Sequence, residues 1–300
     1  MRSGVDDDLR PLLAACALAV VLAACAALLQ ARRDFGQGLV APRPGRERAG
    51  LAGSVVGLPW VLHRRLLTGW IVGLTLLGVV LGTLVASAGD VLAGGGAIGD
   101  LLGGGADGGS LALMFATTVL QLVAILAAVM GVQIAMGLYT EESEHRVEPL
   151  LAGTLRRPTL LATYLALALV ATAVAMLLAG TTLGLVAHAS DASVPVGDVV
   201  AQALATVPAV WVLLALAFAA VGAVPSRRIV GWAGVAATFG LTIIGPTFNL
   251  WDWALDISPL RHVPTVWSAA PGWGGLVGLG VVIVLLLAAA FAGYRRRDVG

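Results

Sequence analysis

Charged residues are scarce in this sequence, and lysine is absent. Only 12% of the 300 residues are charged, whereas 59% are hydrophobic, and the mean hydropathy is +0.94. A chain this apolar cannot present a charged surface to water, so its natural solvent is lipid. Without lysine the chain also cannot form a P-loop, which requires Gly-Lys-Ser/Thr after its glycines. The composition therefore excludes a soluble domain and this type of nucleotide site.

Residues that form disulfides or bind metals are also few. Cys16 and Cys25 are nine positions apart in one predicted helix, about 13 Å along its axis, which is too far for a disulfide. The four histidines are scattered along the chain and predict no metal site. The glycine-rich run 92–110 opens no strand-to-helix unit, so we interpret it as an exterior loop rather than a phosphate site. We expect no catalysis and no cofactor bound by this chain.

Long charge-free stretches divide the chain. Each can hold the ~20 residues that a helix needs to cross ~30 Å of hydrocarbon. They are residues 11–31, 66–89, 108–140, 158–190, 199–226, 229–251 and 262–294. The alternation typical of a barrel strand is absent, and lipid offers no water to unpaired backbone groups. The predicted fold is all-α, a polytopic transmembrane helical bundle of about seven spans.

The arginines predict the orientation of this bundle. With the N-terminus outside, seven alternating spans place all but Arg2, Arg10 and Arg261 on the cytoplasmic side, as the positive-inside rule requires. We therefore expect a multi-pass protein of the cell membrane with a cytoplasmic C-terminus. The first span has an alternative interpretation, because VLAAC at 21–25 matches the pattern before a lipidated cysteine. Its N-terminal flank is acidic, however, whereas a signal peptide has a basic one.

Two span ends carry the same signature. ARRDFGQG at 31–38 follows the first span, and YRRRDVG at 294–300 follows the last. Arginines are common at the cytoplasmic ends of spans, so the Arg pair alone does not require a repeat. The Asp and Gly that follow the pair in both places are explained less well in this way. The repeat predicts that 1–31 is the closing span of a preceding unit, that 32–50 is a cytoplasmic linker, and that 51–300 is a complete six-span unit. On this interpretation the rest of the first unit is missing.

Residues 51–66, at the start of the six-span unit, mix apolar side chains with a basic group. Trp60, His63, Arg64 and Arg65 lie close together in the sequence. Such a segment is typical of a helix that lies along the inner membrane interface before the span begins. The alternative is an early start of the span helix.

Residues 140–158 form a polar segment between two apolar stretches. Four glutamates cluster there, and Pro149 is suited to the first position of a short helix that Gly153 can end. Acids this dense around an apolar pair favour a docking surface, whereas a plain connecting loop is the alternative. The residues that we assign to this predicted surface are Glu141, Glu142, Glu148, Pro149, Leu150, Leu151 and Gly153.

Polar side chains within the spans are few and uncharged. They either line a substrate path or form hydrogen bonds between helices. They are Thr117, Thr118, Gln121, Gln133 and Gln202. Because no charged residue occupies the middle of a span, the proton or ion relays of secondary transporters are not indicated.

The exterior segment 249–275 is rich in tryptophan and proline. Its prolines exclude one long helix, and its tryptophans suit the outer interface. We expect a short re-entrant or interfacial helical hairpin that acts either as an outer gate or as an aromatic belt that anchors the helices. The candidate gate residues are Trp251, Trp253, Pro259, His262, Pro264 and Trp267.

Several motifs together resemble a known family. YTEESEHRVEPLLAGTLRRPTLLATYL at 139–165 is similar to the loop after the second helix in permease subunits of ATP-binding-cassette exporters of the second type. The resemblance is greatest to actinobacterial polyketide or antibiotic exporter permeases. It is supported by SPLRHVPT at 258–265, by the RRRD end and by RRDFGQGL after the first span.

The resemblance implies a function. In that family the loop is a coupling helix that docks on a separate ATPase subunit, which would bind ATP and Mg. This implies a permease component of an ATP-driven exporter for a hydrophobic compound, partnered by the ATPase and by a second permease half or copy. The alternatives are a secondary transporter or channel, and a non-transporting anchor or regulatory partner of another permease half.

Overall fold

Helices make up the part of the chain that the structure describes. The structure is a computed structural model; it describes residues 20–21, 23–24, 27–28, 57–94, 108–144, 157–248 and 250–296. The chain divides into two units, Met1–Gly50 and Leu51–Gly300. Only three short helical pieces of the first unit are described, so most of the predicted first span and the linker 32–50 lie outside the described residues.

The second unit is built from long helices followed by shorter ones. The long helices are α2 (Gly57–Gly94), α4 (Gly108–Ser143), α6 (Arg157–Ser190), α7 (Val196–Ala223) and α10 (Gly274–Arg296). The shorter elements between α7 and α10 are η2 (Pro225–Arg227), α8 (Ile229–Phe239), η3 (Gly240–Ile244), η4 (Gly245–Phe248), α9 (Asp252–Leu255) and η5 (Pro259–His262). The described residues contain no strand, which confirms the predicted all-α class.

Six segments of the second unit are long and apolar enough to cross a membrane. They are Gly57–Ser87, Ala112–Ser143, Pro158–Ser190, Val196–Ala223, Pro225–Phe248 and Gly274–Arg296. Each overlaps one of the charge-free stretches of the sequence. These helices are rich in alanine and leucine and apolar on all sides, as expected of helices surrounded by lipid and by each other. The protein is therefore a polytopic helical membrane protein.

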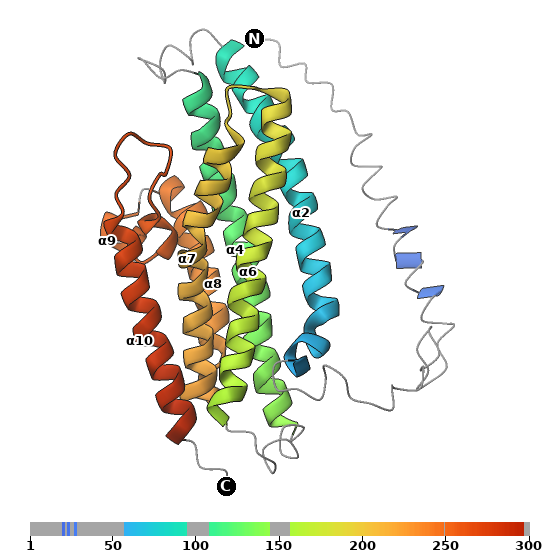
Figure 1. Cartoon of the computed structure of the whole chain (residues 1–300), viewed down its shortest axis with the longest axis vertical. Helices are drawn as coiled ribbons and strands as arrows, with labels where there is room; N and C mark the ends of the chain where they lie inside the picture. Colours follow the sequence, from blue (N-terminus) through green and yellow to red (C-terminus); the bar gives the residue numbers. More distant parts are fainter. Residues whose placement is uncertain are drawn as a thin grey trace. The chain divides into compact units, whose positions relative to one another are not determined.

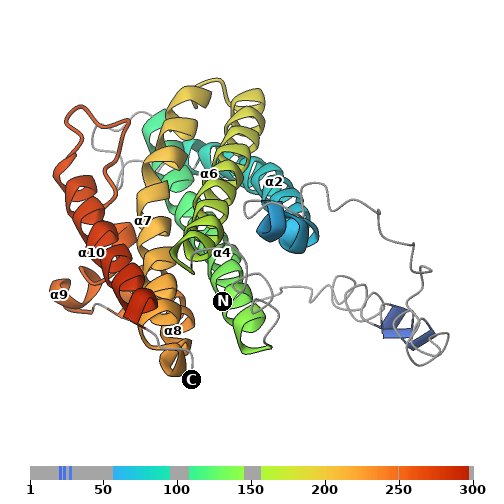
Figure 2. The same cartoon turned by 60° about the horizontal axis from the view of Figure 1, so that its bottom comes forward.

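The helices lie side by side in one bundle (Figures 1 and 2). α2 packs mainly on α6, α10 packs mainly on α7, and α7 also contacts α4 and α6. The core between them contains Tyr164, Met176 and Phe218. α4 and α7 therefore lie at the centre of the bundle, whereas α2 and α10 lie at its edges.

Small residues allow two of these helix pairs to pack closely. At Gly78 of α2, an added Cβ would meet Thr182 and the carbonyl oxygen of Ala179 on α6. At Gly222 of α7, an added Cβ would meet the backbone of Ala290 on α10. Gly78 and Gly82 form the GxxxG spacing that lets helix backbones approach each other in membranes.

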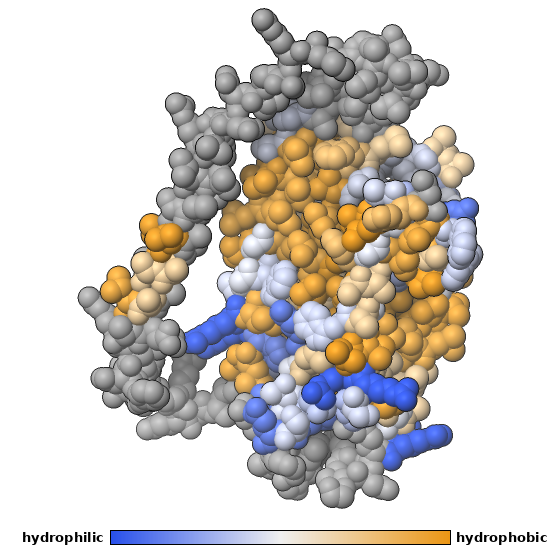
Figure 3. Space-filling model, turned by 180° about the vertical axis from the view of Figure 1, so that it is seen from behind, coloured by the Kyte–Doolittle hydropathy of each residue, from blue (hydrophilic) through white to orange (hydrophobic). Residues whose placement is uncertain are grey.

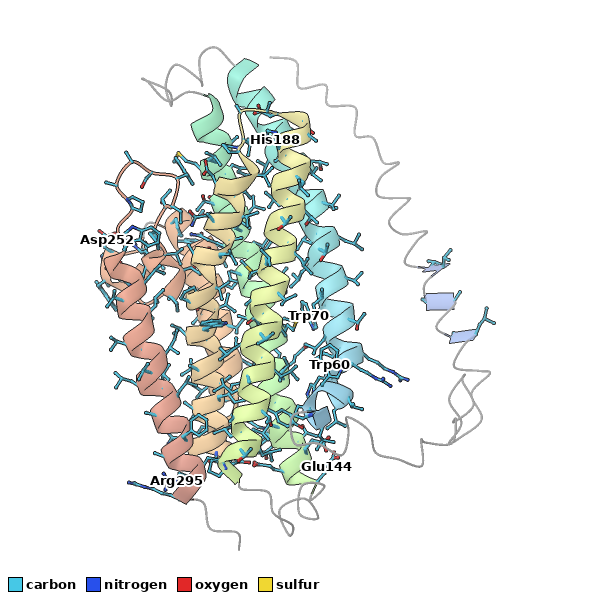
Figure 4. The ribbon with its side chains drawn as sticks, viewed as in Figure 1. Trp60, Trp70, Glu144, His188, Asp252 and Arg295 are labelled. Atoms are coloured by element: carbon cyan, nitrogen blue, oxygen red, sulfur yellow. The ribbon has the colours of Figure 1, made fainter. Side chains whose placement is uncertain are left out.

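Hydrophilic residues gather at one end of the bundle. The space-filling view shows a broad apolar band with most of the hydrophilic residues toward the lower end (Figure 3). Glu144 and Arg295 lie at that end, whereas His188 lies at the opposite end (Figure 4). We call the end that carries Arg227, Arg228, Arg295 and Arg296 the arginine-rich end; this is the end predicted to face the cytoplasm.

The turn between α6 and α7 lies at the opposite end. The Nδ1–H group of His188 donates to the carbonyl oxygen of Val194, at 2.9 Å. The backbone N–H of Ser193 donates to Oδ1 of Asp191, also at 2.9 Å. Hydrogen bonds from Ser193 to the ionised carboxylate hold the pKa of Asp191 below its usual range. These contacts fix a short connection between the two antiparallel helices.

The described part of the predicted interfacial helix, residues 57–66, forms the beginning of α2 without a break. Its first turns bend away from the axis of the rest of the helix (Figure 1). Residues 51–56 lie outside the described residues, and the position of this segment at a membrane interface stays a prediction.

The fifth described span is not one regular helix. It begins with η2 and α8, continues as a π-helix at η3 and ends as a 3₁₀ helix at η4. The glycines at 240 and 245 and the proline at 246 explain why the α-helical pattern ends here. After this span, two short helices, α9 and η5, lead back to α10 (Figure 1).

Candidate functional site

The last turns of α4 lie at the arginine-rich end and contact two other segments. The Tyr294 hydroxyl of α10 donates a hydrogen bond to Oε1 of Glu142. The Arg228 guanidinium donates to the Tyr139 hydroxyl at 3.2 Å and lies 4.5 Å from the centre of the Tyr139 ring. α4 is thus connected by side chains both to the end of α10 and to the start of α8.

His63 connects the beginning of α2 to the same region. Its side chain is buried, and its Nδ1–H group donates to the carbonyl oxygen of Pro59 at 3.0 Å. Its ring packs edge-on against Tyr164 of α6, with 5.5 Å between the ring centroids. Gly137 of α4 makes room for it, because an added Cβ there would overlap the imidazole. His63 therefore lies where α2, α4 and α6 meet.

The other predicted residues of this region are distributed differently. Trp60, Arg64 and Arg65 are exposed on α2. Glu141 precedes Glu142 on the last turn of α4. The remaining predicted docking residues, Glu148, Pro149, Leu150, Leu151 and Gly153, lie outside the described residues. Their assignment to a docking surface stays a prediction.

Three of the polar span residues, Thr117, Gln133 and Gln202, form hydrogen bonds between elements. Gln133 Oε1 accepts from Nε1 of Trp70 at 2.7 Å, which joins α4 to α2. Thr117 Oγ1 accepts from Nε1 of Trp267 at 3.2 Å. Thr118 instead donates to Met114 within its own helix, at 3.1 Å. Contact of these residues with a substrate stays a prediction.

Gln202 of α7 holds the exterior segment in place. Its side chain is 2% exposed. Its Nε2 donates to the carbonyl oxygen of Pro264 at 3.1 Å, and its Oε1 accepts from the backbone N–H of Val266 at 2.9 Å. One buried amide thus satisfies two backbone groups of a segment without regular structure, as buried polar groups require.

The candidate gate residues occupy two environments. Trp251 and Trp253 are exposed, with ring centroids 6.1 Å apart and an interplanar angle of 27°. Pro259, by contrast, is buried. His262 Nε2–H donates to the carbonyl oxygen of Asp256 at 2.8 Å. The Trp251–Trp253 pair suits an interface anchor, whereas Pro264 and Trp267 are tied to α7 and α4 by the bonds described above.

A cavity of ≈ 240 Å³ lies between α4, the broken fifth span and the exterior segment. Its apolar lining residues are Leu241, Pro246 and Leu255, and its polar ones are Gln121, Thr242, Ser258 and Arg261. The hydroxyl groups of Thr242 and Ser258 are hydrogen-bonded at 2.7 Å. Of the polar span residues predicted from the sequence, Gln121 is the one that lines this cavity.

Two carboxylates hold Arg261 at the edge of this cavity. Its Nη2 lies 2.8 Å from Oδ1 of Asp252, and its Nε lies 3.1 Å from Oδ1 of Asp256. Figure 4 shows Asp252 toward the end of the bundle opposite Arg295. Sequence reasoning did not single out Thr242, Ser258 or Arg261 as site residues. The available signal was the Gly240…Gly245-Pro246 pattern, which predicts a break within an apolar span.

The described residues contain no group of three or more His, Cys, Asp or Glu side chains that could hold a metal ion. What they do contain is a polytopic bundle with a charged end, polar bonds between helices and a small cavity near the other end. These features are those of a polytopic helical membrane protein.

Comparison with known proteins identifies the family. Residues 53–295 match the family described as the C-terminal domain of the multidrug efflux system permease Rv1217c, and the chain belongs to this family. It is also similar to the multidrug efflux system permease protein Rv1217c of Mycobacterium tuberculosis (strain ATCC 25618 / H37Rv), with 34% identity over 296 residues. The match covers 96% of this chain and 53% of that protein, so the chain spans about half the length of this relative. The resemblance to exporter permeases is thereby confirmed.

Proposed function

We propose that this chain is a membrane permease component of an ATP-driven exporter that moves a lipophilic compound out of the cell. The observation that carries the proposal is the family match over 53–295, which covers the six described spans except for residue 296 at the end of the last. The relative's printed name is that of a multidrug efflux permease. Because the sequence lacks lysine and hence a P-loop, we assign ATP and Mg binding to a separate ATPase subunit.

The segment that follows α4 is the proposed contact with that ATPase. Residues 145–156 connect the arginine-rich ends of α4 and α6, and they contain the proposed coupling residues Glu148, Leu150 and Leu151. A push on this segment would move the last turns of α4. The Glu142–Tyr294 and Tyr139–Arg228 contacts would then carry the movement to α10 and α8. Alternation between inward-open and outward-open arrangements is a rigid-body transition of the kind known in other switching proteins.

The remaining parts of the proposal concern the assembly. We place the chain in the cell membrane, with a second permease half or copy beside it and with lipid around it. The exported compound is lipophilic, because the described spans contain no charged residue in their middle.

Two coupling variants test the proposal. Glu148→Arg and Leu150→Asp should weaken the association with the ATPase and abolish transport, while membrane insertion stays unchanged. A control is Ala192→Arg, which introduces an arginine, as Glu148→Arg does, but in the exposed turn at the opposite end of the bundle. Co-purification from detergent-solubilised membranes measures the association. An undiminished ATPase complex with both coupling variants would contradict the coupling assignment.

A further inference from the structure

One side of α2 is exposed along much of the described helix. α2 packs mainly on α6 and α4, and the side chains on the packed side are buried, as at His63, Leu67 and Leu74. On the other side, Val72 and Leu76 are 51% and 60% exposed. The exposed apolar residues that continue this side are Val79, Val80 and Leu84. α2 therefore presents an apolar surface outward from the edge of the bundle.

Two arginines stand at one end of this surface. Arg64 and Arg65 are both exposed, and Arg65 precedes Val72 by seven residues and Leu76 by eleven. Both spacings are close to whole turns of a helix, so these three side chains lie along one line. Arg64 lies on a neighbouring line with the exposed Trp60, four residues before it. We call these five residues, Trp60, Arg64, Arg65, Val72 and Leu76, the outer face of α2.

The length of α2 places the arginine pair at a membrane boundary. Its apolar span runs from Gly57 to Ser87, which is longer than the ~20 residues that the hydrocarbon layer requires. From Arg65 to Ser87 an α-helix rises about 33 Å, close to the ~30 Å thickness of that layer. With Ser87 at one boundary, the arginines lie among the headgroups at the other. Trp60 lies toward the arginine-rich end (Figure 4), and tryptophan is enriched at headgroup depth.

The charge of the pair is not balanced by the described residues. The ion pairs among these residues are those of Arg261, so neither Arg64 nor Arg65 has a described carboxylate as its partner. The only acid in α2 itself is Asp90, about 37 Å farther along the axis. The outer face thus combines two positive groups at headgroup depth with an apolar surface at the depth of the acyl chains. An anionic phospholipid has the complementary arrangement.

We infer that the outer face of α2 binds an anionic phospholipid in the leaflet at the arginine-rich end. The guanidinium groups of Arg64 and Arg65 bind the phosphate, because their planar N–H donors match its oxygens. Val72 and Leu76 contact the acyl chain. Phosphatidylglycerol is favoured over phosphatidylcholine or phosphatidylethanolamine, since the cationic group of the latter two offsets the phosphate charge. This binding requires neither ATP nor a partner subunit, so it is independent of the proposed function.

Photo-crosslinking tests the inference on the full chain. The chain is reconstituted in phosphatidylcholine nanodiscs with a small fraction of phosphatidylglycerol that carries a diazirine in one acyl chain. Peptide mass spectrometry should find adducts in α2 on the stretch that contains Val72 and Leu76. Replacing part of the bulk lipid by unlabelled phosphatidylglycerol should lower the yield of these adducts, whereas replacement by phosphatidylethanolamine should not. Equal effects of the two lipids would overturn the inference.

A soluble competitor distinguishes a lipid from free phosphate. Glycerol 3-phosphate carries the phosphate without acyl chains, so it should leave the α2 adducts unchanged at concentrations comparable to that of the lipid. Displacement of the probe by glycerol 3-phosphate would show a site for soluble phosphate compounds, and would contradict the assignment to phospholipid.

Two pairs of substitutions locate the binding. Arg64→Gln combined with Arg65→Gln should lower the yield of α2 adducts about fivefold for each arginine removed. Arg295→Gln combined with Arg296→Gln is the matched control, because it removes the same charge from exposed positions at the same end of α10. The control should leave the α2 adducts unchanged. All four side chains are exposed, so both variants should keep the fold, which circular dichroism checks. Equal losses in the two variants would refute the location.

A second copy of the chain is the competing occupant of this face. It would exclude the lipid probe from α2 and bring Leu76 of two chains into proximity. Leu76→Cys, in a chain carrying Cys16→Ala and Cys25→Ala, would then form a disulfide between the copies under oxidation. We expect adducts on α2 and no such disulfide. A disulfide together with an absence of adducts would overturn the inference.

Discussion

The role of each polar side chain in the spans depends on the groups that lie next to it. Gln202 bonds to two backbone groups of the exterior segment, Gln133 bonds to Trp70, and Gln121 instead lines a cavity. The three glutamines therefore have different structural roles, because the fold places different groups within reach of each side chain.

Gln202→Leu should release the exterior segment. The change removes both bonds and leaves the Pro264 carbonyl and the Val266 N–H unpaired, at a cost of about 1–3 kcal/mol for each buried group. Hydrogen exchange of the Val266 amide should therefore become faster. Thr118→Val is the control, because Thr118 is exposed and bonds within its own helix. Equal exchange rates in the two variants would show that Gln202 does not hold the segment.

These partners could not be predicted from the sequence. Thr117, Gln133 and Gln202 stand out as polar residues in apolar stretches, and the sequence predicts either interhelical bonds or a substrate path for each. Trp267 lies 150 positions from its partner Thr117, and Pro264 lies 62 positions from Gln202. Such pairings depend on how the helices pack, which local patterns do not contain.

At the scale of elements, helix pairs are held by close backbone contact. α2 and α6 approach at Gly78 and Gly82, and Thr182 Oγ1 donates across the interface to the carbonyl oxygen of Thr75 at 3.1 Å. Between helices in lipid no hydrophobic driving force operates, so packing and such bonds supply the stability.

Gly78→Ala should destabilise this pair. The added methyl would overlap backbone and Thr182 atoms of α6, which typically costs about 1–3 kcal/mol. Gly73→Ala on the same helix is the matched control, because an added Cβ there meets nothing within 4 Å; it should be neutral or slightly stabilising. Unfolding in mixed micelles, followed by circular dichroism, measures the difference. Equal stability of the two variants would mean that the close approach at Gly78 is not required.

The long helices could be predicted from the sequence, because one local rule determines where each of them lies. A membrane of fixed thickness requires a long apolar helix, so each of the six described spans overlaps a charge-free stretch of the sequence. The π-helical and 3₁₀ turns at the end of the fifth span were not foreseen. They depend on Gly240, Gly245 and Pro246 acting together with the packing of Leu255 and Ser258.

At the scale of the whole molecule, the arginines of the described bundle lie mainly at one end. The connections of α7 illustrate this, because Arg227 and Arg228 follow its last turn, whereas the turn before it contains Asp191 and no arginine. The positive-inside rule then predicts that the arginine-rich end faces the cytoplasm.

Cysteine labelling measures this orientation. In a chain carrying Cys16→Ala and Cys25→Ala, Ser226→Cys should react with a membrane-impermeant reagent only after the membrane is opened. Ala192→Cys should react in intact cells. Both positions are exposed and lie beyond opposite ends of α7. The reverse labelling pattern would overturn the predicted topology.

On the proposed function, ATP hydrolysed by the partner subunit drives outward movement of a lipophilic compound through this chain. Uptake into inside-out vesicles that contain the chain and its associated proteins measures this movement, with a fluorescent lipophilic dye as the transported compound. We expect uptake that requires hydrolysable ATP, persists after ionophores collapse the ion gradients, and is lost in Glu148→Arg. Uptake that follows an ion gradient without ATP would indicate a secondary transporter and contradict the account. A stable complex with the ATPase that shows no uptake would contradict it equally, because it would indicate an anchoring or regulatory subunit.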